Sequence, residues 1–266
     1  MCYSPVNLKK TTAKQFVKDT YFTQQVPCGK CVECRKARVN SWFVRLKDEV
    51  GRYPCKFITL TYDDVNLPYS ENGLMSLHIR DVQLFFKRLR KLQSDKIKYF
   101  AVGEYGGQTN RPHYHIILFN VKDFDNVSRC WDKGFVHYGD VTDKSIYYTL
   151  KYSVKNLFDF NGDVDDDRVK SKAFMSKGLG LGYLSDNIRR YYSDDVSRPV
   201  TLLGNRKLAL PRYYRDKLFD DGQKIKRNII LSDVVKQKAE RFSDKKFPSY
   251  VREIIRRSKS SLIDKL

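Results

Sequence analysis

The strongest constraint on the fold is a pair of strand-like runs separated by only seven residues. Residues 97–105 (IKYFAVGEY) and 113–121 (HYHIILFNV) are rich in β-branched and aromatic residues, and the connection, 106–112, carries two glycines and a proline. A parallel pair would need a crossover of a dozen or more residues, so these strands are expected to pair antiparallel. An antiparallel hairpin is therefore predicted at the centre of the fold.

Further strand and helix patterns surround this hairpin. Alternation predicts strands at 57–62 and 134–141, and apolar residues at helical spacing predict helices at 34–50, 79–92, 123–134, 144–158 and near 184–192. A second hairpin is expected at 199–211, followed by helix in the basic last forty or so residues. This order is typical of the α+β class, with one antiparallel sheet and helices packed on one of its faces.

The charge balance indicates a polyanionic partner. The chain has 51 Lys and Arg against 31 Asp and Glu, a formal charge of +20. Such a surplus favours nucleic acid, with a membrane surface as the weaker alternative. No stretch approaches the ~20 apolar residues that a spanning helix needs, and the start lacks the apolar core of a secretory signal. We therefore expect no membrane partner and a cytoplasmic location, where structural disulfides are unusual.

Two of the four histidines form a pair that could bind a metal ion. His113 and His115 are two residues apart in a predicted strand, so both side chains face the same side of the sheet. Two solvent-facing histidines are the alternative, and from the pair alone it is the better one. Glu104 ends the preceding strand, and if it lies opposite His113 all three side chains share one face. Two imidazoles and a carboxylate suit Mg²⁺ or Mn²⁺ and leave coordination positions open.

The predicted helix at 144–158 carries a doubled tyrosine–lysine pattern. Tyr148, Lys151, Tyr152 and Lys155 are spaced i, i+3, i+4 and i+7, which puts them on one helical face. The alternative is an ordinary amphipathic helix whose Tyr and Lys stems lie along its boundary. A phenol with a pKa near ~10 is a poor nucleophile unless it is assisted, and a neighbouring ammonium or a metal ion supplies that assistance.

A cluster of cysteines lies near the start of the chain. Cys28, Cys31 and Cys34 are spaced C-x-x-C-x-x-C, a pattern able to hold one Zn²⁺ with a fourth ligand from elsewhere. Cys2 is the first candidate for that ligand and Cys55 the second. An iron–sulfur cluster and three free thiols are the alternatives.

Taken together, these motifs resemble the HUH endonucleases of the rolling-circle initiator type. FITLTY is similar to their first motif, RPHYHIIL to their metal motif and YYTLKYSVK to their tyrosine motif. The doubled tyrosine resembles that of the two-tyrosine initiators of microviruses, and the opening VPCGKCVECRKARVNSW is most similar to replication initiation proteins of the gokushovirus branch. The resemblance covers roughly residues 20–190.

The resemblance implies a fold, an activity and a set of roles. It implies a five-stranded antiparallel sheet with the tyrosine helix beside the histidine strand. It implies a nickase and strand transferase acting on origin DNA and single-stranded DNA in the bacterial cytoplasm, with the host replication helicase and polymerase as partners. The implied ligands are His113 and His115, with Glu104 as the third at a position where families differ; the implied nucleophiles are Tyr148 and Tyr152, with Lys151 and Lys155 as supporting cations. Tyr147 fits a looser version of the motif but points to another side of the helix, so we expect it in the core.

Three segments are expected along the chain. Residues 1–50 form a Cys-rich basic segment with a zinc site, residues 51–200 the HUH nuclease domain, and residues 201–266 a hairpin with a basic helical extension. Two other interpretations stay open: a zinc-stapled nucleic-acid-binding protein without catalysis, and an HUH transposase, which normally carries one tyrosine.

Overall fold

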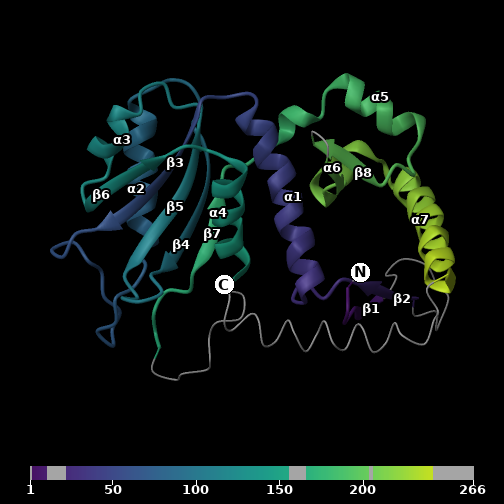
Figure 1. Ribbon diagram of the computed structural model, residues 1–266, viewed down its shortest axis with the longest axis horizontal. Coiled ribbons are helices and arrows are strands. Elements are labelled where there is room, and N and C mark those ends of the chain that lie inside the picture. Colours follow the sequence, from purple (N-terminus) through teal and green to yellow (C-terminus); the bar gives the residue numbers. More distant parts are fainter. Residues whose placement is uncertain (1, 11–21, 156–165, 204–205, 242–266) are drawn as a thin grey trace. The chain divides into compact units, whose positions relative to one another are not determined.

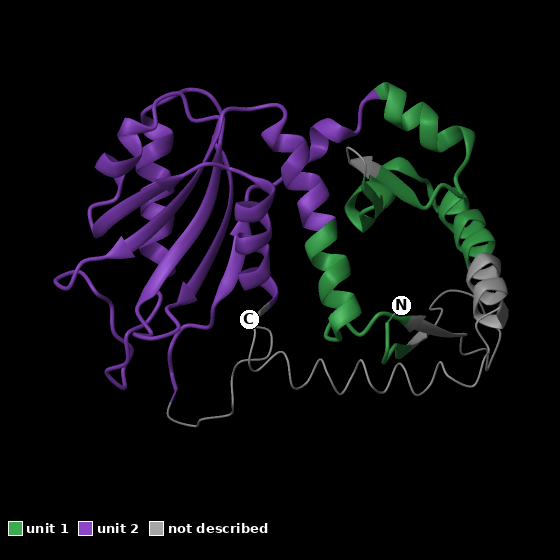
Figure 2. Cartoon of the chain, viewed as in Figure 1, with its two compact units in different colours: residues 1–40, 186–266 green, residues 41–185 purple. Residues whose placement is uncertain are grey.

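The computed structural model describes residues 2–10, 22–155, 166–203 and 206–241. These residues form two compact units, one of residues 41–185 and one of residues 1–40 with 186–266 (Figure 2). The threefold division expected from the sequence stays a prediction. No described helix is long and apolar enough to cross a membrane.

The unit of residues 41–185 is built on a five-stranded antiparallel sheet (Figure 1). Its strands lie in the order β6-β3-β5-β4-β7, with bounds β3 Cys55–Tyr62, β4 Lys98–Tyr105, β5 Pro112–Phe119, β6 Gly134–Gly139 and β7 Lys172–Met175. The β4–β5 hairpin is confirmed, and so is the expected α+β fold with a five-stranded sheet. Periodicity did not predict the edge strand β7, because four residues are too few to show an alternation.

One face of the sheet holds the main hydrophobic core. Helix α2, Ile79–Lys91, lays Val82, Phe85, Phe86 and Leu89 on it, and the short α3, Asp125–Cys130, adds Val127. The strand residues facing them are fully buried and are mostly aliphatic or aromatic: Ile58, Leu60, Tyr62, Ala101, Tyr114, Ile116 and Leu118. The apolar face expected from the sequence of α2 is therefore the face that packs on the sheet.

The other face of the sheet is covered by α1 and α4, so the expectation of helices on one face only was wrong. Helix α1, Val32–Val50, places Trp42 with its ring 5.0 Å from that of Phe100 on β4. Helix α4, Asp143–Lys155, stacks Tyr147 on Phe43 of α1 at 4.2 Å, which confirms Tyr147 as a packing residue. The sheet's central strands are buried on both sides for this reason.

Tyr114 shows how strand alternation separates the two faces. It lies between His113 and His115 in sequence but points into the core, where it is 0% exposed. Its hydroxyl accepts a hydrogen bond from the His78 backbone N–H and lies 3.2 Å from the Tyr62 hydroxyl. Gly103 lies opposite Tyr114, and a Cβ there would come within 3.0 Å of the Tyr114 ring, so the close approach needs glycine.

The second unit has shorter elements. It contains the hairpin β1 Val6–Lys10 with β2 Phe22–Val26, helix α5 Asp186–Asp194, the hairpin β8 Val200–Leu203 with β9 Arg206–Ala209, and helices α6 Arg212–Leu218 and α7 Asp221–Arg241. A 3-10 turn, η1 Leu181–Tyr183, ends the unit of residues 41–185. The expected helix near 184–192 and the second hairpin are confirmed, whereas the β1–β2 hairpin was missed. The expected helix beyond residue 241 lies outside the described residues.

A buried ion pair joins the end of α1 to the sheet. Glu49 is fully buried and accepts two hydrogen bonds from the Lys98 ammonium on β4, at 3.0 and 2.9 Å. The backbone N–H of Gly180 donates a third at 2.7 Å. Because burial strips water from both charges, each depends on the other to stay buried.

Replacing Glu49 by Ala should destabilise the fold strongly. The substitution leaves the Lys98 ammonium without its carboxylate and the Gly180 N–H without its acceptor, which costs roughly 3–5 kcal/mol for a buried pair. Chemical denaturation would measure the free energy of unfolding. The neighbouring Asp48→Ala is the matched control, because its partner Arg52 is 44% exposed and such pairs contribute about 0–1 kcal/mol. Equal losses in the two variants would contradict the prediction.

Candidate metal and tyrosine site

The β4–β5 hairpin positions the three predicted metal ligands. Glu104 on β4 lies directly opposite His113 on β5, and His115 follows two residues later on the same face. The ligand atoms of these three side chains all lie within 4.8 Å of one another. The arrangement that the sequence left conditional on register is therefore present in the structure.

Each imidazole directs its Nε2 at the same carboxylate oxygen. The Nε2 atoms of His113 and His115 both lie 2.9 Å from Glu104 Oε1. The other ring nitrogens are held from behind: His113 Nδ1 lies 3.1 Å from the Arg111 carbonyl, and His115 Nδ1 lies 3.0 Å from Thr59 Oγ1. Such outer partners fix the ring orientation of a metal-binding histidine and its tautomer.

Burial gives this group the character of a cation site. Glu104 and His115 are 4% and 5% exposed, and Glu104 Oε2 is buried without a hydrogen-bond partner among the described residues. An ionised oxygen left unpaired in a buried place is costly, and a cation would satisfy it. Two imidazole nitrogens and a carboxylate fit a divalent ion and leave coordination positions open for another ligand.

The pKa values of the group are consistent with a bound cation. Burial by itself raises the pKa of Glu104, but the hydrogen bonds from His113 and His115 and their charges outweigh it, so the net shift is downward. Burial lowers the pKa of His113, while its hydrogen bonds to Glu104 and to the Arg111 carbonyl raise it, with a net upward shift. Glu104 is therefore ionised at neutral pH, and protons on His113 compete with a metal ion.

The two predicted nucleophiles lie beside this group. The Tyr148 and Tyr152 rings lie 5.0 and 5.6 Å from the His115 ring. The Tyr152 hydroxyl donates a hydrogen bond to the Tyr148 oxygen at 3.2 Å, as their i, i+4 spacing on α4 allows. Tyr148 is 44% exposed, so its hydroxyl is open to a ligand. Burial raises the pKa of Tyr152, and the hydrogen bond to Tyr148 and the Glu104 charge add to the rise.

The lysines of the tyrosine helix are less completely placed. Lys151 lies on α4 and is partly buried, and the side chain of Lys155 lies outside the described part of the chain. Their role beside the tyrosines stays a prediction.

Two side chains that contact His115 were missed in the sequence. Thr59 bonds to the ring nitrogen of His115, and the Phe57 ring stacks on the imidazole at 5.6 Å between centroids. Both lie on β3, which pairs with β5 although the two strands are far apart in the chain. The alternation of FITLTY puts Phe57, Thr59 and Thr61 on one face, which was the available signal, but the pairing partner of β3 was not readable.

The cysteine cluster is a second group able to hold a metal ion. Cys2, Cys28, Cys31 and Cys34 bring their sulfurs within 4.8 Å of one another. Cys55, the other candidate for a fourth ligand, begins β3 and is not among the residues grouped there. The expectation of two metal-binding groups is met, while the identity of each metal stays a prediction.

An antiparallel sheet that carries a Glu-His-His group beside a tyrosine helix has a counterpart among known proteins. Residues 55–157, which contain this whole site, match the family model of the replication-associated protein ORF2. The chain is 34% identical over 251 residues to the replication-associated protein ORF2 of Spiroplasma virus 4, covering 84% of this chain and 76% of that relative. The chain therefore belongs to the family of phage replication-associated proteins.

Two further relatives come from other phages. The replication-associated protein VP4 of Bdellovibrio phage phiMH2K is 29% identical over 217 residues, which cover 71% of this chain and 66% of that protein. The replication-associated protein ORF4 of Chlamydia phage 1 is 30% identical over 226 residues, which cover 74% of this chain and 54% of that protein. No solved structure matches the chain significantly. The resemblance inferred from the motifs is thus confirmed at the level of the family.

Substituting Glu104 by Gln should weaken metal binding. The amide keeps the size of the side chain but removes the charge that the two imidazoles face, and even outer-shell substitutions cost about 10–100-fold in metal affinity. We expect the Mn²⁺ dissociation constant, measured by titration calorimetry, to rise at least about tenfold. Glu71→Gln, on an exposed loop residue, is the control and should bind as the parent does. Unchanged affinity in Glu104→Gln would exclude this carboxylate as a ligand.

Proposed function

We propose that this protein is a replication initiator that nicks one DNA strand at an origin and later rejoins it. Tyr148 or Tyr152 is the nucleophile, and the link formed is a 5′-phosphotyrosine. The proposal rests on one observation above all: two tyrosine hydroxyls lie within hydrogen-bond distance of each other and beside the Glu104, His113 and His115 group. A structural role for a phenol pair would not require a buried cation site next to it.

The reaction that we propose exchanges one phosphate ester for another. The tyrosine oxygen attacks the phosphorus of a phosphodiester, the bond from phosphorus to the 3′-oxygen breaks, and the departing oxygen takes a proton to become a free 3′-hydroxyl. The phenol proton passes to solvent or to a neighbouring base. Because the new tyrosyl ester conserves the bond energy, a 3′-hydroxyl can attack it later and reseal the strand.

Each residue has a role in this scheme that matches its surroundings. Glu104, His113 and His115 would hold Mg²⁺ or Mn²⁺, which polarises the scissile phosphate and stabilises charge on the leaving oxygen. The Tyr152 hydroxyl donates to the Tyr148 oxygen, and a donor so placed stabilises a Tyr148 phenolate. Lys151 and Lys155 would contribute positive charge along the same helix.

The substrate class and setting follow from charge and from family. A formal charge of +20 favours a long polyanion, and contacts to phosphates carry most of the non-specific affinity of proteins for DNA. The relatives are phage replication-associated proteins, so the bacterial cytoplasm is the proposed site of action. Host replication helicase and polymerase are the proposed partners, since a nicked origin has to be unwound and extended.

Covalent capture tests the nucleophile. Incubation with Mn²⁺ and a labelled single strand that contains the phage origin should give a protein–DNA adduct that survives denaturation. The Tyr148→Phe/Tyr152→Phe double variant should give none, while Tyr147→Phe, on the same helix but stacked on Phe43, should give the parental amount. Adducts at the parental level in the double variant would overturn the assignment of the nucleophiles.

Removing the imidazoles separates cleavage from binding. The His113→Ala/His115→Ala variant should lose several kcal/mol of transition-state stabilisation, on the order of a thousandfold in cleavage rate. Binding to the same strand, followed by fluorescence anisotropy over a salt series, should change little because phosphate contacts dominate it. His78→Ala, at the start of α2, is the control and should cleave normally. Normal cleavage by the double variant would exclude the metal role.

A further inference from the structure

We propose that Cys2, Cys28, Cys31 and Cys34 bind one Zn²⁺ through four thiolates, and that this closed site fixes the β1–β2 hairpin to the start of helix α1. The sequence left the fourth ligand and the kind of metal group open. The cysteine site shares no residue with the nuclease site, so it stands independently of the proposed function.

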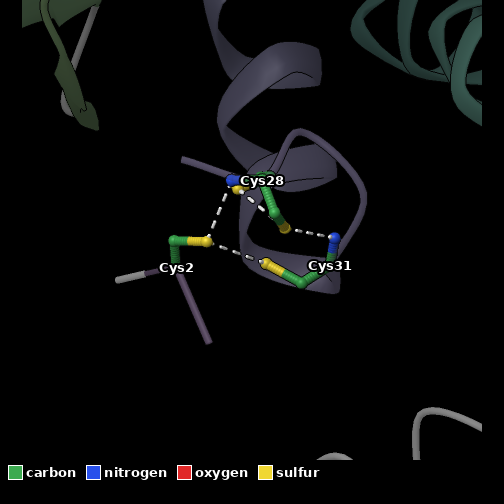
Figure 3. A group of neighbouring side chains, drawn as sticks. Cys2, Cys28 and Cys31 are labelled. Atoms are coloured by element: carbon green, nitrogen blue, oxygen red, sulfur yellow. Dashed lines mark hydrogen bonds between the residues drawn. The ribbon is translucent and has the colours of Figure 1, made fainter. Parts of the chain in front are cut away.

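The distances between the sulfurs suit a single tetrahedral ion. The Sγ atoms of Cys28 and Cys34 lie 4.0 Å apart, and those of Cys2 and Cys31 lie 3.9 Å apart. With a Zn–S distance near 2.3 Å, the edge of a regular ZnS₄ tetrahedron is about 3.8 Å. Figure 3 shows the sulfurs of Cys2 and Cys31 turned toward each other, with that of Cys28 beside them. Four thiolates surround one point from separate segments of chain.

Backbone donors are directed at the sulfurs. The N–H groups of Lys30 and Cys31 both donate to Cys28 Sγ, at 3.4 and 3.3 Å, and the N–H of Cys28 donates to Cys2 Sγ at 3.2 Å. The turn needs Gly29, whose φ is +75°. Hydrogen bonds to coordinating atoms orient ligands and offset the negative charge of several thiolates around one ion.

The same geometry argues against the other sulfur chemistries. Every described cysteine is free, and the pairs at 3.9 and 4.0 Å are far from the bonded distance of about 2.05 Å. The cysteines of a [4Fe–4S] cluster each bind a different iron, which holds their sulfurs farther apart than sulfurs that share one ion. Four protein ligands also leave no open position, so the site is structural and not catalytic.

The place of the cysteines shows what the ion would hold together. Cys2 precedes β1 and Cys28 follows β2, just beyond the base pair Val6 and Val26 of the hairpin. A two-stranded hairpin alone is marginally stable in water. Cys34 lies in the first turn of α1, so one ion joins both ends of the hairpin to the helix. Binding energy at such a site is folding energy for the segments that it joins.

Metal content tests the proposal on the full chain. The protein purified under reducing conditions without chelator should contain about one zinc per chain by mass spectrometry of the elements. The His113→Ala/His115→Ala variant should keep this zinc, which separates the cysteine site from the nuclease site. Cys28→Ser/Cys31→Ser should lose it, and the control Cys55→Ser should retain it. Zinc absent from the parent, replaced by iron, or retained in Cys28→Ser/Cys31→Ser would overturn the proposal.

Cobalt spectroscopy reports the ligand set of the parent chain itself, so it does not depend on the folding of a variant. The parent, with its metal exchanged for Co²⁺, should show the intense visible bands of tetrahedral cobalt and sulfur-to-cobalt charge transfer. Cys2→Ala should weaken both, because one of the four thiolates is lost. Weak bands typical of six oxygen or nitrogen ligands in the parent, or an unchanged spectrum in Cys2→Ala, would overturn the assignment. Origin cleavage is a separate measurement, so either proposal can fail alone.

Discussion

The candidate nuclease site depends on the pairing register of β4 with β5. Glu104 meets His113 because the seven-residue connection closes in one way: the Gly106 N–H donates to the Arg111 carbonyl and the Asn110 N–H donates to the Gly106 carbonyl. Asn110 adopts a positive φ of 53°, a conformation that asparagine tolerates better than most residues. A slip of one residue would turn both imidazoles into the core and Tyr114 out of it. The buried Tyr114 hydroxyl network therefore protects the register on which the ligand group relies.

Features carried by local spacing could be predicted from the sequence. The shared face of His113 and His115, the hairpin, the amphipathic α2 and the i, i+4 tyrosines each follow from a period of two or of 3.6 residues. The Glu104–His113 pairing was within reach because the loop between them is short. These local patterns were enough to bring the three ligands of the candidate metal site together.

Features carried by long-range pairing could not be predicted in the same way. Thr59 reaches His115 because β3 inserts beside β5, and no local period reveals which strands become neighbours. The edge strand β7 is too short to alternate visibly and depends on β4 as a template. Helices on both faces also escaped prediction, because the aromatic contacts of Trp42 and Tyr147 join elements far apart in the chain.

The contact between the two tyrosine hydroxyls limits how the pair can work. At 3.2 Å, the two oxygens lie closer together than neighbouring phosphates along a single strand can lie. Whatever occupies the space in front of one oxygen therefore also occupies the space in front of the other. The two phenols compete for a single docking position and cannot address two strand ends at once. Any division of labour between them is a matter of timing, with the strand exchanged between the first event and the second.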